Sequence, residues 1–375
     1  MTGTGSPTTT HRRRWRWIAL TVAAVVLLGG TAYAVTRVAG DERRALPEPT
    51  APPPTAPTPS PTPTPSPTPE PGAGIRGPLD ILLVGVDTRV SVPDWEPHAD
   101  SVLILHVTED LDRAYLFSLP RDLVVDIPAF PKSGYRGGRT KLTHAMSYGS
   151  RRGDAKPSAD QGFELLRQTV SRYTGIRTFH AGAILNFGGF ERLVDEIGGV
   201  DMYVDQTVVS IHRRPDGKGR TLRGGDYVGP QATYRPGNRH FVGWQAIDYA
   251  RQRYTAGGDY TRQRHQQQLI KAILTKATSS GLADDPLALG GLLRALGDSV
   301  IFKGGEHGAV DFAFALRRLR AQNLTLVGLP GSSVGRGSGY RGEQLTRVGR
   351  DFIAQLRAGR ADAYLETHPD LVVRR

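Results

Sequence analysis

Apolar runs of strand length and apolar residues at helical spacing follow one another along most of the chain. Leu79–Val86 (LDILLVGV) is an almost continuous apolar run that stops at Asp87, as in a strand buried on both faces. The apolar runs 101–107 and 113–119 flank the polar segment 108–112 and predict a β-hairpin. Strands mixed with helices in this way predict one α/β domain, with a central mixed β-sheet flanked by helices.

Helical periodicity recurs after this hairpin. Apolar residues lie three and four positions apart in the segments 163–173, 187–197, 244–249, 261–278, 351–356 and 361–365. Shorter apolar runs predict further strands at 179–185, 200–204 and 325–328. The Gly-rich segment 328–342 lacks the Lys-Ser/Thr of a phosphate-binding P-loop, so it is predicted to be a flexible loop.

The N-terminal part of the chain has a different pattern. Residues 17–35 carry no charge, and a helix of this length spans roughly 30 Å of hydrocarbon. Four arginines precede it, so the positive-inside rule predicts a cytoplasmic basic tail (1–16), a transmembrane anchor (17–36) and an extracytoplasmic remainder. Ala32-Tyr33-Ala34 has the form of a signal-peptide cleavage site, which leaves removal of this segment open.

A Pro/Thr/Ser-rich tract separates the apolar segment from the rest. Residues 45–73 cannot bury a core and favour an extended polyproline II conformation, so they are predicted to be a linker. The folded domain is therefore predicted to occupy residues 74–375.

Composition excludes some chemistry and directs attention to anions. The chain has no cysteine, so disulfides, thiolate metal sites and cysteine nucleophiles are excluded. Its formal net charge of +12 makes nucleic acid the first partner to consider. A membrane anchor that places the basic domain outside the cell argues against this, and no nucleic-acid partner is expected.

Acidic and basic residues are predicted to meet at one end of the hairpin. Its centre lies between residues 110 and 111, so facing residues have numbers that add to about 221, as those of Asp100 and Arg121 do. If the strand before Asp87 runs parallel to the second hairpin strand, Asp87 and Asp122 reach the same edge. Carboxylates without His or Cys neighbours suit Mg²⁺, although aspartates at strand ends are also common as caps and turn residues.

Four arginines gather in the segment YARQRYTAGGDYTRQRHQQQ (249–268). Arg251 and Arg253 would share one face of an extended chain, and Arg262 and Gln266 share one face of the predicted helix. Asp259 is predicted to cap that helix. Arginine forks and a helix N-terminus match a pyrophosphate, and a solvated, salt-bridged surface is the alternative.

The order of motifs resembles the LytR–CpsA–Psr family over about residues 79–278. The blocks that carry the resemblance are ILLVGVDTR, ADSVLIL, FSLPRDLVVDIP, KLTHAMSYG, ILNFGGFERLVDEIGGVDMYV, GWQAIDYARQRY and GGDYTRQRHQQQLIKAIL. The resemblance implies an α/β fold with an apolar lipid-binding pocket. It also implies a phosphotransferase that moves a glycopolymer, such as a teichoic acid, from a polyprenyl-pyrophosphate carrier to peptidoglycan through a phosphodiester bond.

Site residues follow from the same resemblance. It implies that Asp87 and Asp100 bind Mg²⁺, with Mn²⁺ as an alternative, and that the pyrophosphate-binding residues are Arg121, Lys141, Arg251, Arg253, Arg262 and Gln266. Asp122 and Asp259 are implied as further catalytic carboxylates, and either could take the proton of the acceptor hydroxyl.

The chain departs from the family pattern in two places and leaves other functions open. His98 and His265 stand where the family commonly has arginine, so each would weaken a phosphate contact or make it only when protonated. A pyrophosphatase that uses water as the acceptor would need the same site. A non-catalytic lipid-binding or regulatory membrane protein is the other alternative.

Overall fold

The computed structural model describes residues 70–87 and 95–374, all within the unit Pro67–Arg375. The predicted cytoplasmic tail, the anchor and nearly all of the linker lie outside the described residues. Within the described ranges, no helix has both the length and the apolar character needed to cross a membrane.

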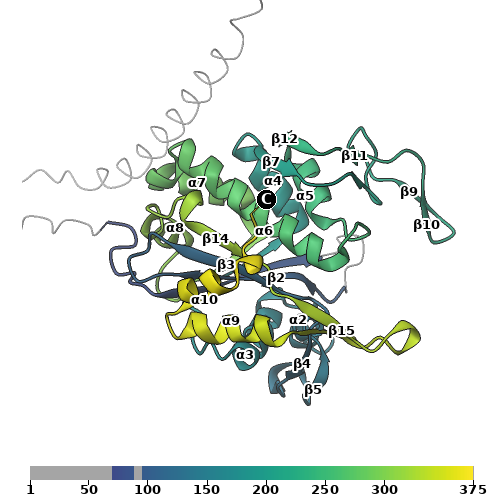
Figure 1. Cartoon of the computed structure of the whole chain (residues 1–375), viewed down its shortest axis with the longest axis horizontal. Coiled ribbons are helices and arrows are strands. Elements are labelled where there is room, and N and C mark those ends of the chain that lie inside the picture. The colour runs from purple at the N-terminus through teal and green to yellow at the C-terminus, as the bar shows by residue number, and fades with distance from the viewer. Residues whose placement is uncertain (1–69, 88–94, 375) are drawn as a thin grey trace, which may run out of the picture. The chain divides into compact units, whose positions relative to one another are not determined.

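A six-stranded mixed sheet forms the centre of the domain (Figure 1). Its strands, in spatial order, are β13 (Val300–Lys303), β6 (Ala181–Asn186), β1 (Leu79–Asp87), β2 (His98–Val107), β3 (Ala114–Leu119) and β14 (Leu324–Val327). β1 pairs in parallel with β6, and β3 pairs in parallel with β14, whereas the other neighbours are antiparallel. The predicted mixed sheet is confirmed.

The register of the hairpin is the predicted one. Val102 faces Leu119 and Val107 faces Ala114, so the numbers of paired residues add to 221. Because β1 and β3 both run antiparallel to β2, their carboxyl ends lie at the same edge of the sheet. This edge carries Asp87.

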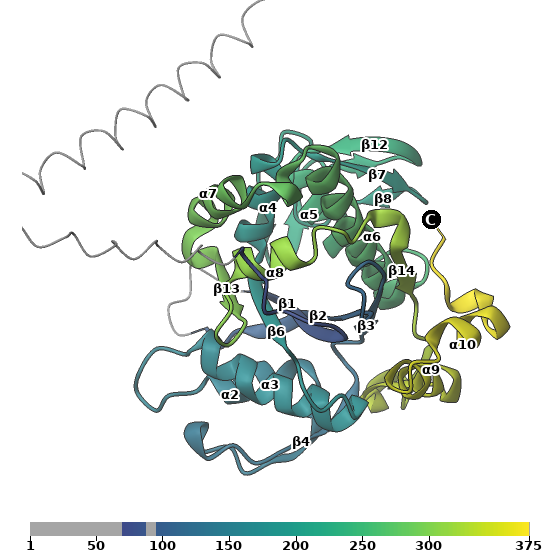
Figure 2. The same ribbon diagram turned by 90° about the vertical axis from the view of Figure 1, so that its left-hand side faces the viewer.

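Helices cover both faces of the sheet (Figures 1 and 2). One layer holds α2 (Thr143–Ser150), α3 (Ala159–Thr174), α9 (Arg347–Arg357) and α10 (Ala361–Thr367). The other layer holds α4 (Phe187–Glu196), α5 (Gly243–Arg251), α6 (Gly258–Ser279), α7 (Pro286–Leu296) and α8 (Ala309–Ala315).

Burial on both faces explains the continuous apolar run of β1. Leu82 and Val84 pack into the core shared with α2, α3 and α9. Leu79 and Ile81 pack on the opposite face, in a core that includes Phe312 of α8. Successive side chains of a strand point to opposite faces, so a strand covered on both sides needs apolar residues at nearly every position.

Short ribbons and turns surround the sheet. Paired strands form β4 (Val124–Ile127) with β5 (Gly138–Lys141), β7 (Val200–Val204) with β12 (Gly237–Phe241), β8 (Val208–Val209) with β11 (Thr233–Tyr234), β9 (Thr221–Arg223) with β10 (Asp226–Val228), and β15 (Gly331–Val334) with β16 (Gly342–Leu345). Single 3₁₀ turns are η1 (Pro131–Ser133), η2 (Leu282–Asp284), η3 (Gly297–Ser299), η4 (Ala321–Asn323), η5 (Gly337–Gly339) and η6 (Pro369–Leu371).

The prediction of a flexible loop over 328–342 is wrong for much of that segment. β15 and β16 pair as an antiparallel hairpin, with Gly331 facing Leu345 and Val334 facing Gly342. The hairpin is also tied to the body of the domain, because the amide of Glu343 donates to the carbonyl of Asp122 over 2.8 Å. Glycines at its tip supply the positive φ angles that the connection needs.

Candidate functional site

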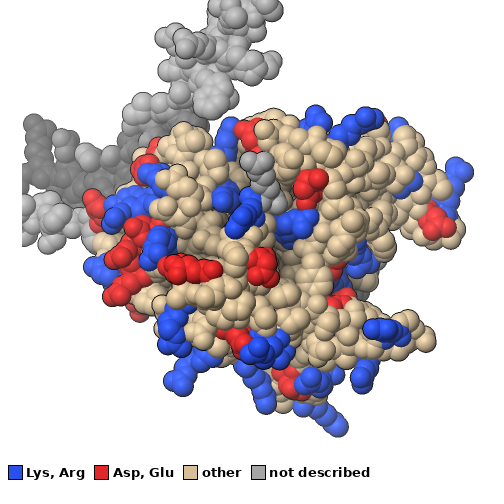
Figure 3. Space-filling view, viewed as in Figure 1, with Lys and Arg blue, Asp and Glu red and all other residues tan. Residues whose placement is uncertain are grey.

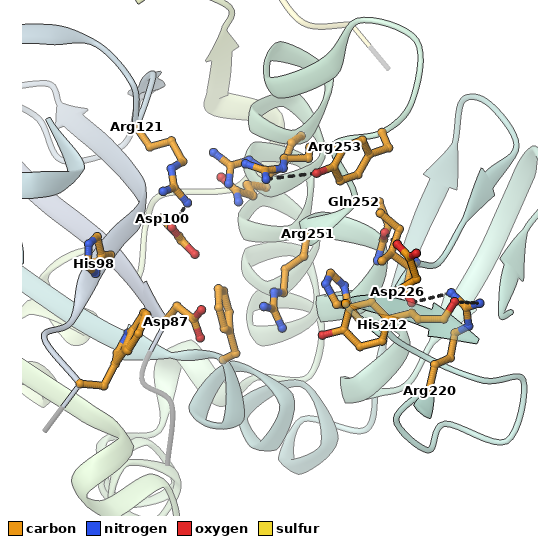
Figure 4. Close-up of a pocket in the computed structure, with 18 residues that line it drawn as sticks. Asp87, His98, Asp100, Arg121, His212, Arg220, Asp226, Arg251, Gln252 and Arg253 are labelled. Carbon is orange, nitrogen blue, oxygen red and sulfur yellow. Dashed lines mark hydrogen bonds and ion pairs between the residues drawn. The ribbon is translucent and has the colours of Figure 1, made fainter. Parts of the chain in front are cut away.

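A cavity of about 890 Å³ opens where the carboxyl ends of β1 and β3 meet α5 and α6 (Figure 4). Two aspartates from the sheet, Asp87 and Asp100, line it. Its other charged lining residues include Arg121 from the loop after β3 and the arginines 251, 253 and 262 from the α5–α6 region. The predicted carboxylate and arginine clusters therefore meet in one cavity.

The hairpin register brings Asp100 and Arg121 together. A nitrogen of the Arg121 guanidinium donates to Asp100 Oδ1. The Nε atom of Arg121 lies 3.6 Å from Asp122 Oδ1. Arg121 is thus held between two carboxylates, with its side chain about one fifth exposed toward the cavity.

Arg251 lies against an aromatic ring at the cavity wall. Its guanidinium carbon is 3.7 Å from the ring centroid of Phe187, the first residue of α4. Burial lowers the pKa of Arg251, although the nearby charges of Asp87 and Asp100 act in the opposite direction. A buried cation in this position has a strong electrostatic preference for an anionic ligand.

The expectation that residues 251–253 are extended holds only in part. Arg251 is the last residue of α5, and the backbone turns extended at Gln252. The Gln252 amide donates to the carbonyl and the carboxylate of Asp248, and its oxygen accepts from the amide of Ile211. These contacts fix the end of the helix, and Arg251 and Arg253 still line one cavity.

Arg262 and Gln266 lie on the same face of α6 and both line the cavity, as predicted. Arg262 is only 5% exposed, and it pairs with Asp259 over 2.7 Å. Burial lowers its pKa, while the charge of Asp259 opposes that shift. The carbonyl oxygen of Gln266 accepts a hydrogen bond from Ser101 on β2 over 2.9 Å, which joins helix to sheet.

Asp259 does not cap α6. The helix begins at Gly258, and the N-cap is Gly257, whose φ of 84° suits glycine. Asp259 instead lies in the first turn, where it binds Arg262 and the amide of Gln263. The Gly-Gly pair starts the helix three residues earlier than the apolar pattern indicated.

Three predicted residues lie behind the cavity wall. Asp122, Lys141 and Asp259 are not among its lining residues. Lys141 Nζ lies 3.5 Å from Asp122 Oδ1, so both are joined to the wall through Arg121. From this position, Asp122, Lys141 and Asp259 can orient the arginines that line the cavity.

Arg264 and His265 point away from the cavity toward Asp205, which follows β7. A guanidinium nitrogen of Arg264 donates to Asp205 Oδ2, and His265 Nε2 lies 3.0 Å from Asp205 Oδ1. The His265 ring is fully buried and stacks on Tyr249 with centroids 4.2 Å apart. Burial alone would raise the pKa of Asp205, but the His265 hydrogen bond and the charges of His265 and Arg264 hold it well below its usual range. A phosphate-binding role for His265 is therefore not supported by this geometry.

His98 does line the cavity. Its Nδ1 atom is 2.9 Å from the carbonyl oxygen of Glu96, and its ring lies 5.8 Å from that of Trp95. A carbonyl partner makes Nδ1 the donor, which leaves Nε2 available as an acceptor.

Several lining residues were missed by the sequence analysis. They come from the segment after β8 and from the end of α5, and they are His212, Arg220, Asp226, Tyr227, Gln252 and Tyr254. Arg220 is held by the carbonyls of Ile211 and Tyr227, which fixes the β9–β10 hairpin over the cavity. No periodicity marks this segment, because its residues are mostly exposed and its strands have only three residues each.

A small apolar pocket adjoins the charged cavity. It is lined by residues of β1, β2, α4, α5 and α6, among them Leu103, Phe190, Ile247, Leu269 and Ile270, and its volume is about 40 Å³. Phe187, Arg251 and Gln266 line both spaces, so they form the partition between them.

The donor set fits a hard cation that binds together with a substrate. Among the described residues, no three His, Cys, Asp or Glu side chains are grouped as a metal site. Asp87 and Asp100 nevertheless line the same cavity. Mg²⁺ is often bound by one or two carboxylates, with phosphate oxygens and waters completing its octahedron, so two aspartates beside an anion site are sufficient.

The fold and the cavity together define a class of α/β proteins with an arginine-lined cavity next to an apolar pocket. The model of the LytR_cpsA_psr family matches residues 63–284, and the chain belongs to this family. The family match ends before α7, so the last ninety residues or so, including the β15–β16 hairpin, lie beyond it.

The individual relatives have low sequence identity to this chain but align with more than half of it. The chain is 26% identical over 284 residues to TagU of Enterococcus faecalis, named a polyisoprenyl-teichoic acid–peptidoglycan teichoic acid transferase, with 74% of this chain and 80% of TagU aligned. It is 25% identical over 322 residues to the cell wall biosynthesis protein LcpA of Corynebacterium glutamicum, with 80% of this chain but only 58% of LcpA aligned. Three other relatives are matched over 43% to 55% of their length.

A solved structure shows the same fold. The crystal structure of TagV from Bacillus subtilis matches with a TM-score of 0.54 at 19% identity, covering 77% of this chain and 98% of TagV.

Proposed function

We propose that this chain is a glycopolymer transferase, which moves a glycopolymer from a polyprenyl-pyrophosphate carrier to peptidoglycan through a phosphodiester bond. The observation that carries the proposal is the composition of the cavity: Asp87 and Asp100 line one space together with the arginines 121, 251, 253 and 262. Family membership and the name of the relative TagU support the same reaction.

The pyrophosphate of the donor would bind among the arginines. Guanidinium groups match phosphate oxygens with paired hydrogen bonds, and Arg251 and Arg262 are largely buried in the wall of the cavity. The lipid tail would enter the apolar pocket behind Arg251. That pocket holds only about 40 Å³, so Phe187 and Ile270 have to move outward when the tail enters.

The reaction needs orientation and charge neutralisation more than a covalent nucleophile. A hydroxyl of peptidoglycan would attack the phosphorus atom that carries the glycopolymer, and the bond from this phosphorus to the bridging oxygen would break. Polyprenyl monophosphate leaves with that oxygen. Arg251 and Arg262 would neutralise the charge that develops on the transferred phosphoryl group.

Asp87 and Asp100 would hold a Mg²⁺ ion, which supplies Lewis-acid stabilisation of the pyrophosphate when it is bound. Mn²⁺ has the same ligand preferences and could replace it. Arg121 donates to Asp100 and would hold this carboxylate in place for the ion.

The proton of the acceptor hydroxyl would pass to a carboxylate. Asp122 and Asp259 are the two candidates from the sequence, and each carries an ion pair with a cation of the site. Neither lines the cavity, so either would take the proton through a bridging water. Replacing each by Asn and comparing kcat at saturating substrates distinguishes them, because loss of the base lowers kcat without a matching change in donor affinity.

The reaction would take place outside the cytoplasm. Residues 17–36 would anchor the chain in the membrane, and residues 45–73 would be the spacer to the folded domain. The lipid-linked donor and peptidoglycan both lie on the outer side of the membrane, where this arrangement places the domain. Cysteine labelling of the full chain at an introduced residue in each part tests this orientation.

The test uses the full chain, a lipid-linked glycan donor and purified peptidoglycan. A transferase releases polyprenyl monophosphate only when peptidoglycan is present, and the glycan becomes attached to it. Release at the same rate without peptidoglycan would show a pyrophosphatase. Binding of the donor without any product under these conditions would favour the non-catalytic alternative.

A further inference from the structure

The β15–β16 hairpin, which follows the family-matched segment, returns to the wall of the site. Gly342 of this hairpin has a φ of 140°, and a Cβ atom placed on it would lie 2.3 Å from the carbonyl oxygen of Asp122. Only glycine permits so close an approach. The hairpin is therefore fixed against the loop that carries Arg121 and Asp122.

Tyr340 connects the hairpin to the charged groups of the site. Its ring lies beneath Lys141, with Nζ 4.9 Å from the ring centroid. Its hydroxyl donates to Glu343 Oε1 over 3.0 Å. Contacts then run from Lys141 to Asp122 and from Asp122 to Arg121.

Several contacts orient this ring in advance. Glu343, which accepts from Tyr340, also accepts from the hydroxyls of Ser333 and Tyr260. Burial and the charge of Asp122 raise the pKa of Tyr340, so its hydroxyl stays protonated and neutral. Tyr340 is nevertheless 38% exposed as a residue and lines a hollow on the hairpin, so it is accessible to a ligand.

A hollow of about 540 Å³ lies beside Tyr340. Its lining consists of Ser332, Ser333, Gly335, Arg336, Gly337 and Tyr340. These residues offer hydroxyl groups, backbone amides, one aromatic ring and one guanidinium, and no large aliphatic side chain. Such a surface suits a ligand with many hydroxyls, an apolar ring face and a carboxylate.

The hairpin projects on the same side of the domain as the β9–β10 hairpin, whose Tyr227 lines the charged cavity (Figure 1). In the space-filling view the outline of the molecule is notched between the two projections (Figure 3). A long polymer could lie along this notch and place one of its units beside the cavity.

We infer that the hollow on the β15–β16 hairpin binds the acceptor, with the sugar ring of a peptidoglycan strand stacked on Tyr340 and a carboxylate of the strand paired with Arg336. The inference rests on the proposed transferase function, to which it adds the place of the acceptor. Tyr340 and Arg336 would then determine the affinity for the acceptor, whereas the arginines of the charged cavity bind the donor.

Kinetics of the full chain in detergent micelles test this assignment, with soluble uncrosslinked peptidoglycan strands as the acceptor. Tyr340→Ala should raise the acceptor KM about tenfold, the size of one lost aromatic contact, and leave the donor KM within about twofold. Tyr340→Phe keeps the ring and should stay within about twofold of the parent. Arg336→Ala should weaken binding of the strands, and should have no effect once their carboxylates are amidated.

Tyr203 provides the matched control. It is a tyrosine with 40% exposure on β7, so Tyr203→Ala removes a similar ring and should leave both KM values unchanged. An unchanged acceptor KM in Tyr340→Ala, or a donor KM that rises equally, would overturn the assignment.

Equilibrium binding without the donor separates this inference from the proposed function. Fluorescently labelled strands should bind the parent chain and bind Tyr340→Ala about tenfold more weakly. If the strands bind through Tyr340 but no transfer occurs, the acceptor site stands and the transferase proposal fails. If transfer occurs and Tyr340→Ala equals the parent in both assays, the acceptor site is wrong and the transferase proposal stands.

Discussion

Arg251 and Arg317 form the same kind of contact in different parts of the domain. The guanidinium carbon of Arg251 lies 3.7 Å from the ring centroid of Phe187, and that of Arg317 lies 4.1 Å from the ring centroid of Phe314. Only Arg251 lines the charged cavity. Replacing each by Ala therefore compares loss of one cation–π contact inside and outside the proposed site.

The expected magnitudes differ between stability and activity. A partly buried cation–π contact contributes about 1 kcal/mol, so each variant should lose about that much free energy of unfolding or less. Arg251→Ala also removes a donor to the developing phosphoryl charge, which should lower kcat/KM by about 10²–10³-fold. Arg317→Ala should keep kcat/KM within about threefold of the parent.

Two assays check this comparison. Urea unfolding gives the change in stability, and transfer from the lipid-linked donor at saturating peptidoglycan gives kcat/KM. Arg251→Lys keeps the charge but not the flat, forked guanidinium, so it should fall between the parent and Arg251→Ala. The reasoning is refuted if Arg251→Ala stays within about threefold of the parent, or if Arg317→Ala loses as much activity.

Other predictions concern packing, pH and metal. A Cβ on Gly182 of β6 would lie 2.2 Å from the ring of Phe163, so Gly182→Ala should lower the free energy of unfolding in urea by about 1–3 kcal/mol. The control is Gly188→Ala on α4, whose Cβ meets only ordinary contacts and should not lower it. Burial, and after it the charge of His98, lower the pKa of His144 in the folded chain. The unfolded chain therefore binds this proton more tightly, and the free energy of unfolding should fall as the pH drops below about 6.5. The fall should be less steep in His144→Gln, and urea unfolding across pH measures it. Chelation by EDTA should abolish transfer until Mg²⁺ is restored. Asp87→Asn should raise the half-saturating Mg²⁺ concentration about tenfold or more without a loss of stability. Equal half-saturating concentrations in the parent and in Asp87→Asn would exclude Asp87 as a ligand.

The sheet could be predicted from the sequence because its register depends on local information. The polar segment 108–112 fixes the centre of the hairpin, and the pairing of Val102 with Leu119 and of Asp100 with Arg121 follows from that centre alone. The continuous apolar run of β1 likewise reports burial on both faces. The shared edge of Asp87 and Arg121 is a consequence of these two features.

Side-chain direction at helix starts was harder to predict. The segment 261–268 was read correctly as helix, but a shift of the start to Gly258 moves Asp259 from the cap into the first turn. Arg264 and His265 turn toward Asp205, a residue sixty positions earlier that no short-range pattern relates to them. Their role depends on a tertiary contact.

The residues after β8 and after β14 also have roles that depend on tertiary contacts. Arg220, Tyr227 and Tyr340 reach the site only because short hairpins fold back over it, and each hairpin strand has three or four residues. Strands of that length leave no periodic signal, and the glycines of the segment 328–342 indicated a loop. The donor side of the site was therefore visible in the sequence, whereas the proposed acceptor side was not.

A structure of the full chain with a short-chain polyprenyl pyrophosphate and Mg²⁺ would show whether the donor binds in the charged cavity. We expect a pyrophosphate held by Arg121, Arg251 and Arg262, a metal ion on Asp87 and Asp100, and a prenyl tail in a widened pocket between Phe187 and Ile270. A pyrophosphate bound outside this cavity, or a tail left in solvent with the pocket still closed, would contradict this expectation.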